Sequence, residues 1–161
     1  MNAALKRLLD SRSIEPFPAT DEEVTARWKA AVGSFQDSRR VVTAEMRIAV
    51  SYQAGLQAAS TVVRSAGYRL RSTPGGHHYT TFATLAALQA GDLAGLANEL
   101  SRSSRRRHRA VYDWHGPDDA EDELDPAPLE RAVADLMDAA YRALVRERPA
   151  LAGVLVPPAG S

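Results

Sequence analysis

The chain has 161 residues, no cysteine and a formal net charge of zero, so we expect one domain that buries a core of its own. The absence of cysteine excludes disulfides, thiolate metal sites and a cysteine nucleophile. No apolar run reaches the roughly 20 residues of a membrane span, and the N-terminus has no apolar signal region, so we expect a cytoplasmic protein that does not enter a membrane.

Alanine, leucine and arginine are frequent and are good helix formers, so the composition predicts an all-α protein. Residues 2–10 form a short amphipathic helix, and Pro16 and Pro18 then indicate a loop. Thr20 and Glu23 match a capping box that opens the next helix. The apolar stripe of this helix contains Val24, Trp28, Ala31, Val32 and Phe35.

A third helix is predicted from Ser38, as its cap, to about residue 66, with Gly67 as the C-terminal glycine. Its small residues Ala54, Gly55 and Ala58 allow neighbouring helices to pack closely. Its apolar stripe contains Val42, Met46, Ala49, Val50, Leu56, Ala59 and Val63. Residues 68–71 have an extended pattern, but one such run cannot form a sheet.

Thr80 or Thr81 is expected to cap a short helix that buries Phe82, Leu85 and Leu88. Asp92 caps a long helix that ends at Gly116 and Pro117. Its inward stripe contains Leu93, Leu96, Ala97, Leu100, Ser104, Arg107, Val111 and Trp114. Pro126 and Pro128 precede or begin the last long helix. That helix buries Leu129, Val133, Leu136, Met137, Ala140 and Leu144.

These elements predict an up-and-down antiparallel helical bundle of four to five main helices. The bundle forms a single domain over residues 1–161, with its core at about residues 20–146. Residues 1–19 hold the short helix and the proline loop. Residues 147–161 form a Pro/Gly-rich tail that we expect to be frayed.

A basic stretch at residues 101–115 holds five arginines and two histidines in the second half of the long helix. The residues spaced to share one helix face are Arg105, His108, Tyr112 and His115. Arg107 continues the neighbouring apolar stripe, where a guanidinium needs a carboxylate, a second subunit or a phosphate as its partner. Alternatively, Arg107 lies at the exposed end of the stripe, where its guanidinium group is solvated.

The basic cluster is suited to phosphate contact, since arginines form charge-assisted hydrogen bonds with phosphate oxygens. A solvated helix face, or the arginine and alanine bias of a GC-rich genome, explains the cluster equally well. The candidate phosphate-binding residues are Arg102, Arg105, Arg106, Arg109, His77 and His78. His77 and His78 have no further ligands at a familiar spacing, so we expect no metal site and no cofactor. They either fix their loop or help to bind a phosphate at the helix start by Thr80 and Thr81.

An acidic segment at residues 118–125 follows the basic stretch directly and carries six carboxylates. Two interpretations of this neighbouring pair of charges are open. The acidic segment folds back on the basic helix and screens it, or it faces water while the basic helix faces a polyanion.

Three segments resemble a prokaryotic HEPN domain: Gly67-Tyr-Arg-Leu70, Gly76-His-His-Tyr-Thr-Thr-Phe-Ala-Thr-Leu85 and Arg106-Arg-His-Arg-Ala-Val-Tyr-Asp113. The helix from Met46 to Gly67 is also similar to the central helix of such domains, and the resemblance covers roughly residues 20–146. It implies a bundle of four or five helices that is usually a homodimer. RNA-cleaving members bring an arginine, its polar neighbour and a histidine together across the dimer cleft. They cut RNA without metal: the histidine acts as acid or base, and the other two stabilise charge on the phosphate.

The resemblance assigns the motif arginine to Arg107 and its polar neighbour to His108. The position of the catalytic histidine is Tyr112, which departs from the nuclease pattern because tyrosine, with an ordinary pKa of about 10, is a poor base at neutral pH. Pairing Arg109 with His115, or Arg102 with His108, restores the spacing in a shifted register, although neither fits the rest of the motif. The candidate catalytic residues are Arg107, His108, Tyr112 and His115.

Three functions are open on this basis. The first is a HEPN-like protein that binds RNA or a nucleotide through its arginine-rich helix, as part of a toxin–antitoxin or phage-defence module. The second is a metal-independent ribonuclease toxin that uses Arg107 with His108 or His115. The third is a structural or regulatory partner of a nucleotidyltransferase.

Overall fold

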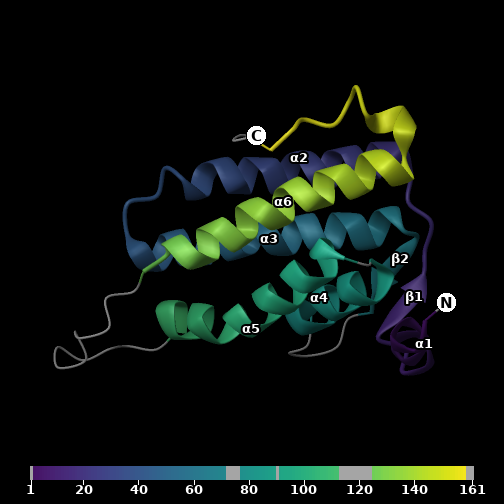
Figure 1. Cartoon of the computed structure of the whole chain (residues 1–161), viewed down its shortest axis with the longest axis horizontal. Helices are drawn as coiled ribbons and strands as arrows, with labels where there is room; N and C mark the ends of the chain where they lie inside the picture. The colour runs from purple at the N-terminus through teal and green to yellow at the C-terminus, as the bar shows by residue number, and fades with distance from the viewer. Residues whose placement is uncertain (1, 72–76, 90, 113–124, 159–161) are drawn as a thin grey trace.

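The computed structural model describes residues 2–71, 77–89, 91–112 and 125–158, and the backbone alone for residues 104–112. Within these ranges the fold is an all-α bundle, as predicted (Figure 1). The helices are α1 (Ala3–Asp10), α2 (Asp21–Ser38), α3 (Ala44–Ser65), α4 (His77–Leu88), α5 (Asp92–Tyr112) and α6 (Ala127–Glu147), followed by a 3-10 turn at Pro149–Leu151. Two short strands, β1 (Ile14–Pro16) and β2 (Tyr68–Leu70), form a two-stranded sheet.

The central helix of the bundle is α3, which packs against α2, α4, α5 and α6 (Figure 1). Ala54, Gly55 and Ala58 are buried on it, in keeping with their small size. At Gly55 the neighbours come so close that a Cβ atom would lie 3.3 Å from side-chain atoms of both Leu100 in α5 and Val133 in α6. This glycine therefore sets how tightly α5 and α6 close on α3.

The apolar stripes predicted for the second and last long helices are confirmed. The buried residues of α2 include Val24, Trp28, Ala31, Val32 and Phe35. Those of α6 include Leu129, Val133, Leu136, Met137, Ala140 and Leu144. Thr20 caps α2, since its hydroxyl accepts a hydrogen bond from the amide of Glu23 at 3.2 Å. The Glu23 side chain is turned toward Arg27 and Arg64, from which it accepts hydrogen bonds.

The start predicted for the third helix is wrong, and so are the first residues of its predicted stripe, whereas Ala59 and Val63 are buried as predicted. α2 continues through Ser38, whose hydroxyl donates to the carbonyl of Phe35 at 2.7 Å, and Thr43 caps α3 instead. Val42 is therefore 92% exposed and Met46 52% exposed. Because α3 contacts helices on several sides, its buried residues do not form a single stripe. The large ones are Ile48, Tyr52, Val62 and Val63.

The sheet corrects the prediction that residues 68–71 lack a partner strand. β1 and β2 pair antiparallel, with Ile14 opposite Leu70. Ile14 is 2% exposed and packs with Leu5 of α1 and Ala87 of α4 in a small second core. The segment predicted as a proline loop thus contains a strand that ties α1 to the bundle.

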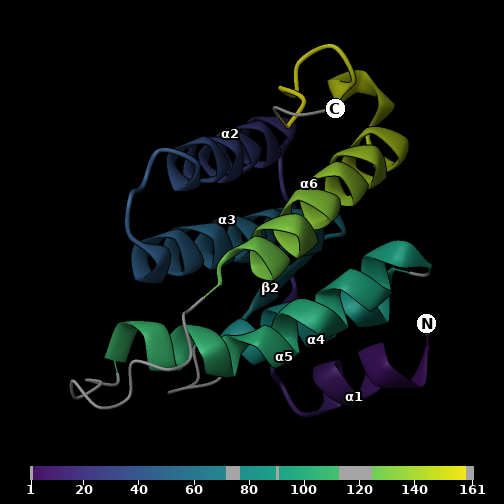
Figure 2. The ribbon, with the colours of Figure 1, turned by 60° about the vertical axis from the view of Figure 1, so that its left-hand side comes forward.

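α4 begins at His77, about one turn earlier than predicted. The hydroxyls of Thr81 and Thr84 donate to the carbonyls of His77 and Thr80, so these threonines lie inside the helix. Only three residues separate α4 from α5, and the two helices pack as an antiparallel hairpin (Figure 2). At about 1.5 Å per residue, the start of α4 lies roughly level with residue 103 of α5, where the basic stretch begins.

The described part of the C-terminal tail is packed, which corrects the prediction that it is frayed. Leu151 and Leu155 are buried. The indole Nε1 of Trp28 donates to the carbonyl of Val156 at 2.7 Å. Figure 1 shows the tail running back over α2, so these residues close one side of the core.

Candidate phosphate-binding sites

α5 is one continuous helix from Asp92 to Tyr112 and contains the basic stretch as far as that residue. Its first half is anchored in the core, since Leu93, Ala97 and Leu100 are 5% exposed or less. These three positions of the predicted inward stripe are confirmed. The arginine-rich second half continues from this anchored segment without a break.

The predicted site residues of this region divide into three groups. Arg102 is exposed and forms no ion pair with another described residue. The helical backbone alone is described for Arg105, Arg106, Arg107, His108, Arg109 and Tyr112. Trp114, His115 and residues 118–124 of the acidic segment lie outside the described residues, so the two interpretations of that segment stay open. Asp125, its last residue, accepts a hydrogen bond from the amide of Ala127 at the start of α6.

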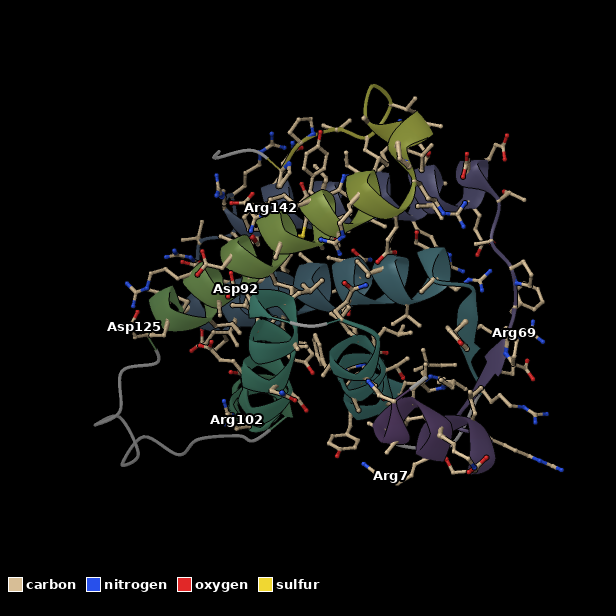
Figure 3. All side chains as sticks on the ribbon, turned by 45° about the vertical axis from the view of Figure 1, so that its right-hand side comes forward. Arg7, Arg69, Asp92, Arg102, Asp125 and Arg142 are labelled. Atoms are coloured by element: carbon tan, nitrogen blue, oxygen red, sulfur yellow. The ribbon has the colours of Figure 1, made fainter. Side chains whose placement is uncertain are left out.

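A cleft of about 610 Å³ lies between α5 and α6, and Arg102 lines it. The acidic side chains on its walls outnumber the basic ones: Asp92, Glu99, Asp135 and Asp138 against Arg102 and Arg142. Figure 3 shows Asp92 and Arg102 toward the two ends of the described side chains of α5, with Arg142 on α6. The lining of this cleft is therefore net negative among the described residues and repels a polyanion.

His77 and His78 lie at the start of α4 and line a second cavity, of about 480 Å³. The ring of His78 packs against that of Tyr52, with 5.7 Å between the centroids. Tyr52 is fully buried in α3, so it fixes this histidine against the core. Arg69, which lines the same cavity, lies far from Arg102 in Figure 3. The two histidines thus line a cavity with Arg69, whereas Arg102 lines the other one, between α5 and α6.

Three arginines that the sequence analysis does not name as candidate site residues also line this cavity: Arg27 of α2, Arg64 of α3 and Arg69 of β2. They come from elements far apart in the chain, so residue spacing cannot reveal them. The sequence holds one signal of the group. An acidic residue, Glu23, lies in the first turn of one helix and Arg64 in the last turn of the next, and antiparallel neighbours bring such ends together.

Arg64 is buried with all of its charge paired. Its Nε and Nη2 atoms donate to the two carboxylate oxygens of Glu23 at 2.9 and 2.8 Å. Its Nη1 atom donates to the carbonyls of Phe17 and Tyr68 at 2.7 and 3.1 Å. The hydrogen bonds from Arg64, together with that from Arg27, hold the pKa of Glu23 below its usual value, although partial burial acts in the opposite direction. Arg64 therefore serves the fold and is not available to a ligand.

Among the described residues, no group of three or more histidine, aspartate or glutamate side chains is arranged to hold a metal ion. In the same part of the chain, no helix combines the length and apolar character that a bilayer crossing needs. No protein-family model, curated protein or solved structure matches the chain. The resemblance to HEPN domains therefore stays a prediction.

Proposed function

We propose that this protein binds RNA or a nucleotide through the arginine-rich second half of α5. The observation that carries the proposal is the single helix from Asp92 to Tyr112, whose first half is anchored in the core by Leu93, Ala97 and Leu100. A helix anchored in this way holds its arginines at a constant spacing. Arginines so spaced form charge-assisted hydrogen bonds with successive phosphates of a nucleic acid backbone.

The charged residues in the cleft beside α5 affect where RNA can bind. The cleft toward α6 is lined by four carboxylates and two guanidinium groups, so a polyanion is repelled from that side. We therefore expect RNA to contact the arginine-rich half of α5 outside this cleft. Arg102, the first arginine of the basic stretch, is exposed at the edge of the cleft, two residues after the buried Leu100.

The resemblance to HEPN domains supports a biological setting for this binding. On that basis the protein is a cytoplasmic homodimer in a prokaryotic toxin–antitoxin or phage-defence module, with a nucleotidyltransferase-type protein as a partner. Tyr112 stands where the nuclease motif has its histidine, and tyrosine is a poor base at neutral pH. We therefore propose binding without cleavage.

Fluorescence anisotropy with a labelled single-stranded RNA tests the proposal. The variant Arg105→Ala/Arg106→Ala/Arg107→Ala removes three positive charges from α5. The matched control, Arg7→Ala/Arg12→Ala/Arg131→Ala, removes three exposed arginines elsewhere and has the same net charge. We expect wild-type affinity to fall as salt rises, the α5 variant to bind about tenfold more weakly or worse, and the control to stay within about twofold of wild type. Equal losses in both variants would end the proposal.

Incubation of the same RNA in EDTA separates binding from catalysis. Cleavage without metal that disappears in His108→Ala or His115→Ala assigns the alternative, a metal-independent ribonuclease. If the protein neither cleaves RNA nor binds it in a salt-dependent way, the remaining function is that of a structural or regulatory partner of a nucleotidyltransferase.

A further inference from the structure

The cavity at the start of α4 has the dimensions of a small-molecule site. It lies where α2, α3, β2 and α4 meet, and its volume is about 480 Å³, within the range typical of ligand pockets. Leu56 and Leu70 give it an apolar wall. Its polar wall includes Arg27, Ser60, Arg69 and His77.

An excess of positive charge is built into this polar wall. Glu23 forms ion pairs with both Arg27 and Arg64. Glu15 forms ion pairs with both Arg69 and Arg71. Three guanidinium groups that line the cavity, those of Arg27, Arg64 and Arg69, therefore share two carboxylates, which leaves one positive charge in excess. In a partly desolvated site such an excess favours an anion, because water screens the charges less than it does at an open surface.

The arginines that carry this excess are held in position and keep free donors. The guanidinium carbon of Arg69 lies 4.0 Å from the centroid of the Phe17 ring, and Arg64 lies 4.8 Å from the same ring. Arg27 and Arg69 use only their Nε atoms in hydrogen bonds with the described residues. Their Nη atoms are left to donate to a bound anion, and a guanidinium fork fits the oxygens of a phosphate.

The start of α4, which also lines the cavity, is a second feature that favours an anion. α4 is a helix of 12 residues that begins at His77, and the first amides of a helix carry partial positive charge. The hydroxyl of Thr81 donates to the carbonyl of His77, so the anion is met by the helix start and the histidines and not by this threonine. His78 is held there by its contact with buried Tyr52.

We propose that this cavity binds the phosphate monoester of a small metabolite. Arg27 and Arg69 hold the phosphate in the cavity that the start of α4 also lines, and the organic part packs against Leu56 and Leu70. The excess positive charge and the partial charge at the helix start both favour a phosphate anion. The site is distinct from the arginine-rich part of α5, and the inference does not rest on the RNA binding proposed there.

Isothermal titration calorimetry with ribose 5-phosphate and with adenosine monophosphate tests the inference. Ribose and adenosine are the uncharged controls, and succinate is a dianion without phosphate. We expect both phosphate esters to bind saturably and the three other compounds to bind at least about tenfold more weakly, a difference of about 1.4 kcal/mol. Absence of saturable binding by both esters would overturn the inference, as would succinate binding as tightly as they do.

Two variants locate the binding. Arg27→Gln removes a half-exposed arginine from the cavity, and Ser60→Tyr fills part of its volume. We expect each to weaken ester binding about tenfold or more, whereas Arg131→Gln, at an exposed position of α6, leaves it unchanged. Wild-type binding in Arg27→Gln, with folding verified by thermal unfolding, would contradict the site. RNA affinity should persist in Arg27→Gln, and ester affinity in the triple α5 variant, so the two proposals fail independently.

Discussion

Arg64, in the last turn of α3, is joined to Glu23, in the first turn of α2, by a bidentate ion pair. The same guanidinium donates to the carbonyl of Phe17, which follows β1, and to that of Tyr68, which begins β2. One buried side chain therefore connects two helices to the two-stranded sheet. Its surroundings also form part of the cavity that we assign to a phosphate ester.

Replacement of Glu23 tests how much this pair contributes to stability. Glu23→Ala leaves Arg64 buried with only its carbonyl partners, and we expect the free energy of unfolding to fall by about 1–3 kcal/mol. The estimate is below the cost of breaking a fully buried pair because the carboxylate is partly exposed. Glu22→Ala is the control, since Glu22 is exposed in the same helical turn. Equal losses in the two variants, measured by urea unfolding, would show that the pair contributes nothing beyond the charge at the helix start.

The contribution of Glu23 should depend on pH in a defined direction. The fold lowers the pKa of Glu23, so the carboxylate binds its proton less readily in the folded than in the unfolded chain. Its stabilisation is therefore fully present above the usual glutamate pKa of about 4.3 and is lost as the pH falls below it toward the folded-state pKa. The difference in unfolding free energy between wild type and Glu23→Ala should shrink over that interval. A difference that stays constant down to about pH 3 would contradict the pairing.

Two glycines should respond in opposite ways to added side chains. Gly33, in α2, has no neighbouring atom within 4 Å of a built Cβ, so Gly33→Ala should stabilise the protein by about 0.5–1 kcal/mol through helix propensity. Gly55→Ala meets Leu100 and Val133 at 3.3 Å and should show no such gain. Gly55→Leu should cost about 1–3 kcal/mol by overpacking. Thermal unfolding of the three variants measures the effect, and a stable Gly55→Leu would disprove the close packing on α3.

Tyr112 offers a test of the family resemblance itself. If Arg107 and His108 correspond to the nuclease motif, Tyr112→His restores the missing acid–base group. We expect this variant to cut RNA in EDTA where wild type does not, and Arg107→Ala in the same background to remove the activity. Tyr112→Phe is the matched control and should remain inactive. An inactive Tyr112→His that still binds RNA would argue against the motif assignment but not against the RNA site.

The fluorescence of Trp28 should change when the packed C-terminal tail is deleted. The chain has two tryptophans, so Trp114→Phe leaves Trp28 as the only emitter. Deletion of residues 149–161 exposes the indole and should shift its emission to the red, with a loss of roughly 2–4 kcal/mol for the two buried leucines. Val154→Ala is the control, because Val154 is 56% exposed. Unchanged emission after the deletion would rule out the tail contact.

The sequence predicts the buried face of a helix well where the opposite face is exposed to solvent. α2 and α6 each have a polar side, so their apolar residues fall on one stripe that fixes the helical phase. α3 contacts four other helices and has no broad polar side, so no single stripe exists to be found. The predicted stripe consequently placed Val42 and Met46 inside, although both are exposed.

The strands and the arginine cavity lie beyond what local pattern reveals. Three-residue strands are too short to show an alternation, and the partner of Ile14 lies 56 positions away at Leu70. The cavity joins arginines from α2, α3 and β2, and their spacing along the chain does not indicate that they meet. The sequence places His77 and His78 in the loop before a helix, whereas they are the first two residues of α4. Only the fold shows which arginines line a cavity with them.

The contact between Trp28 and the tail also bears on how the chain is made. Trp28 belongs to the second helix, yet its cover comes from residues 151–156. During synthesis α2 and α3 can pair early, but the apolar surface around this indole stays open until residues 151–156 have left the ribosome. Until then the nascent chain exposes an apolar surface to chaperones and to aggregation.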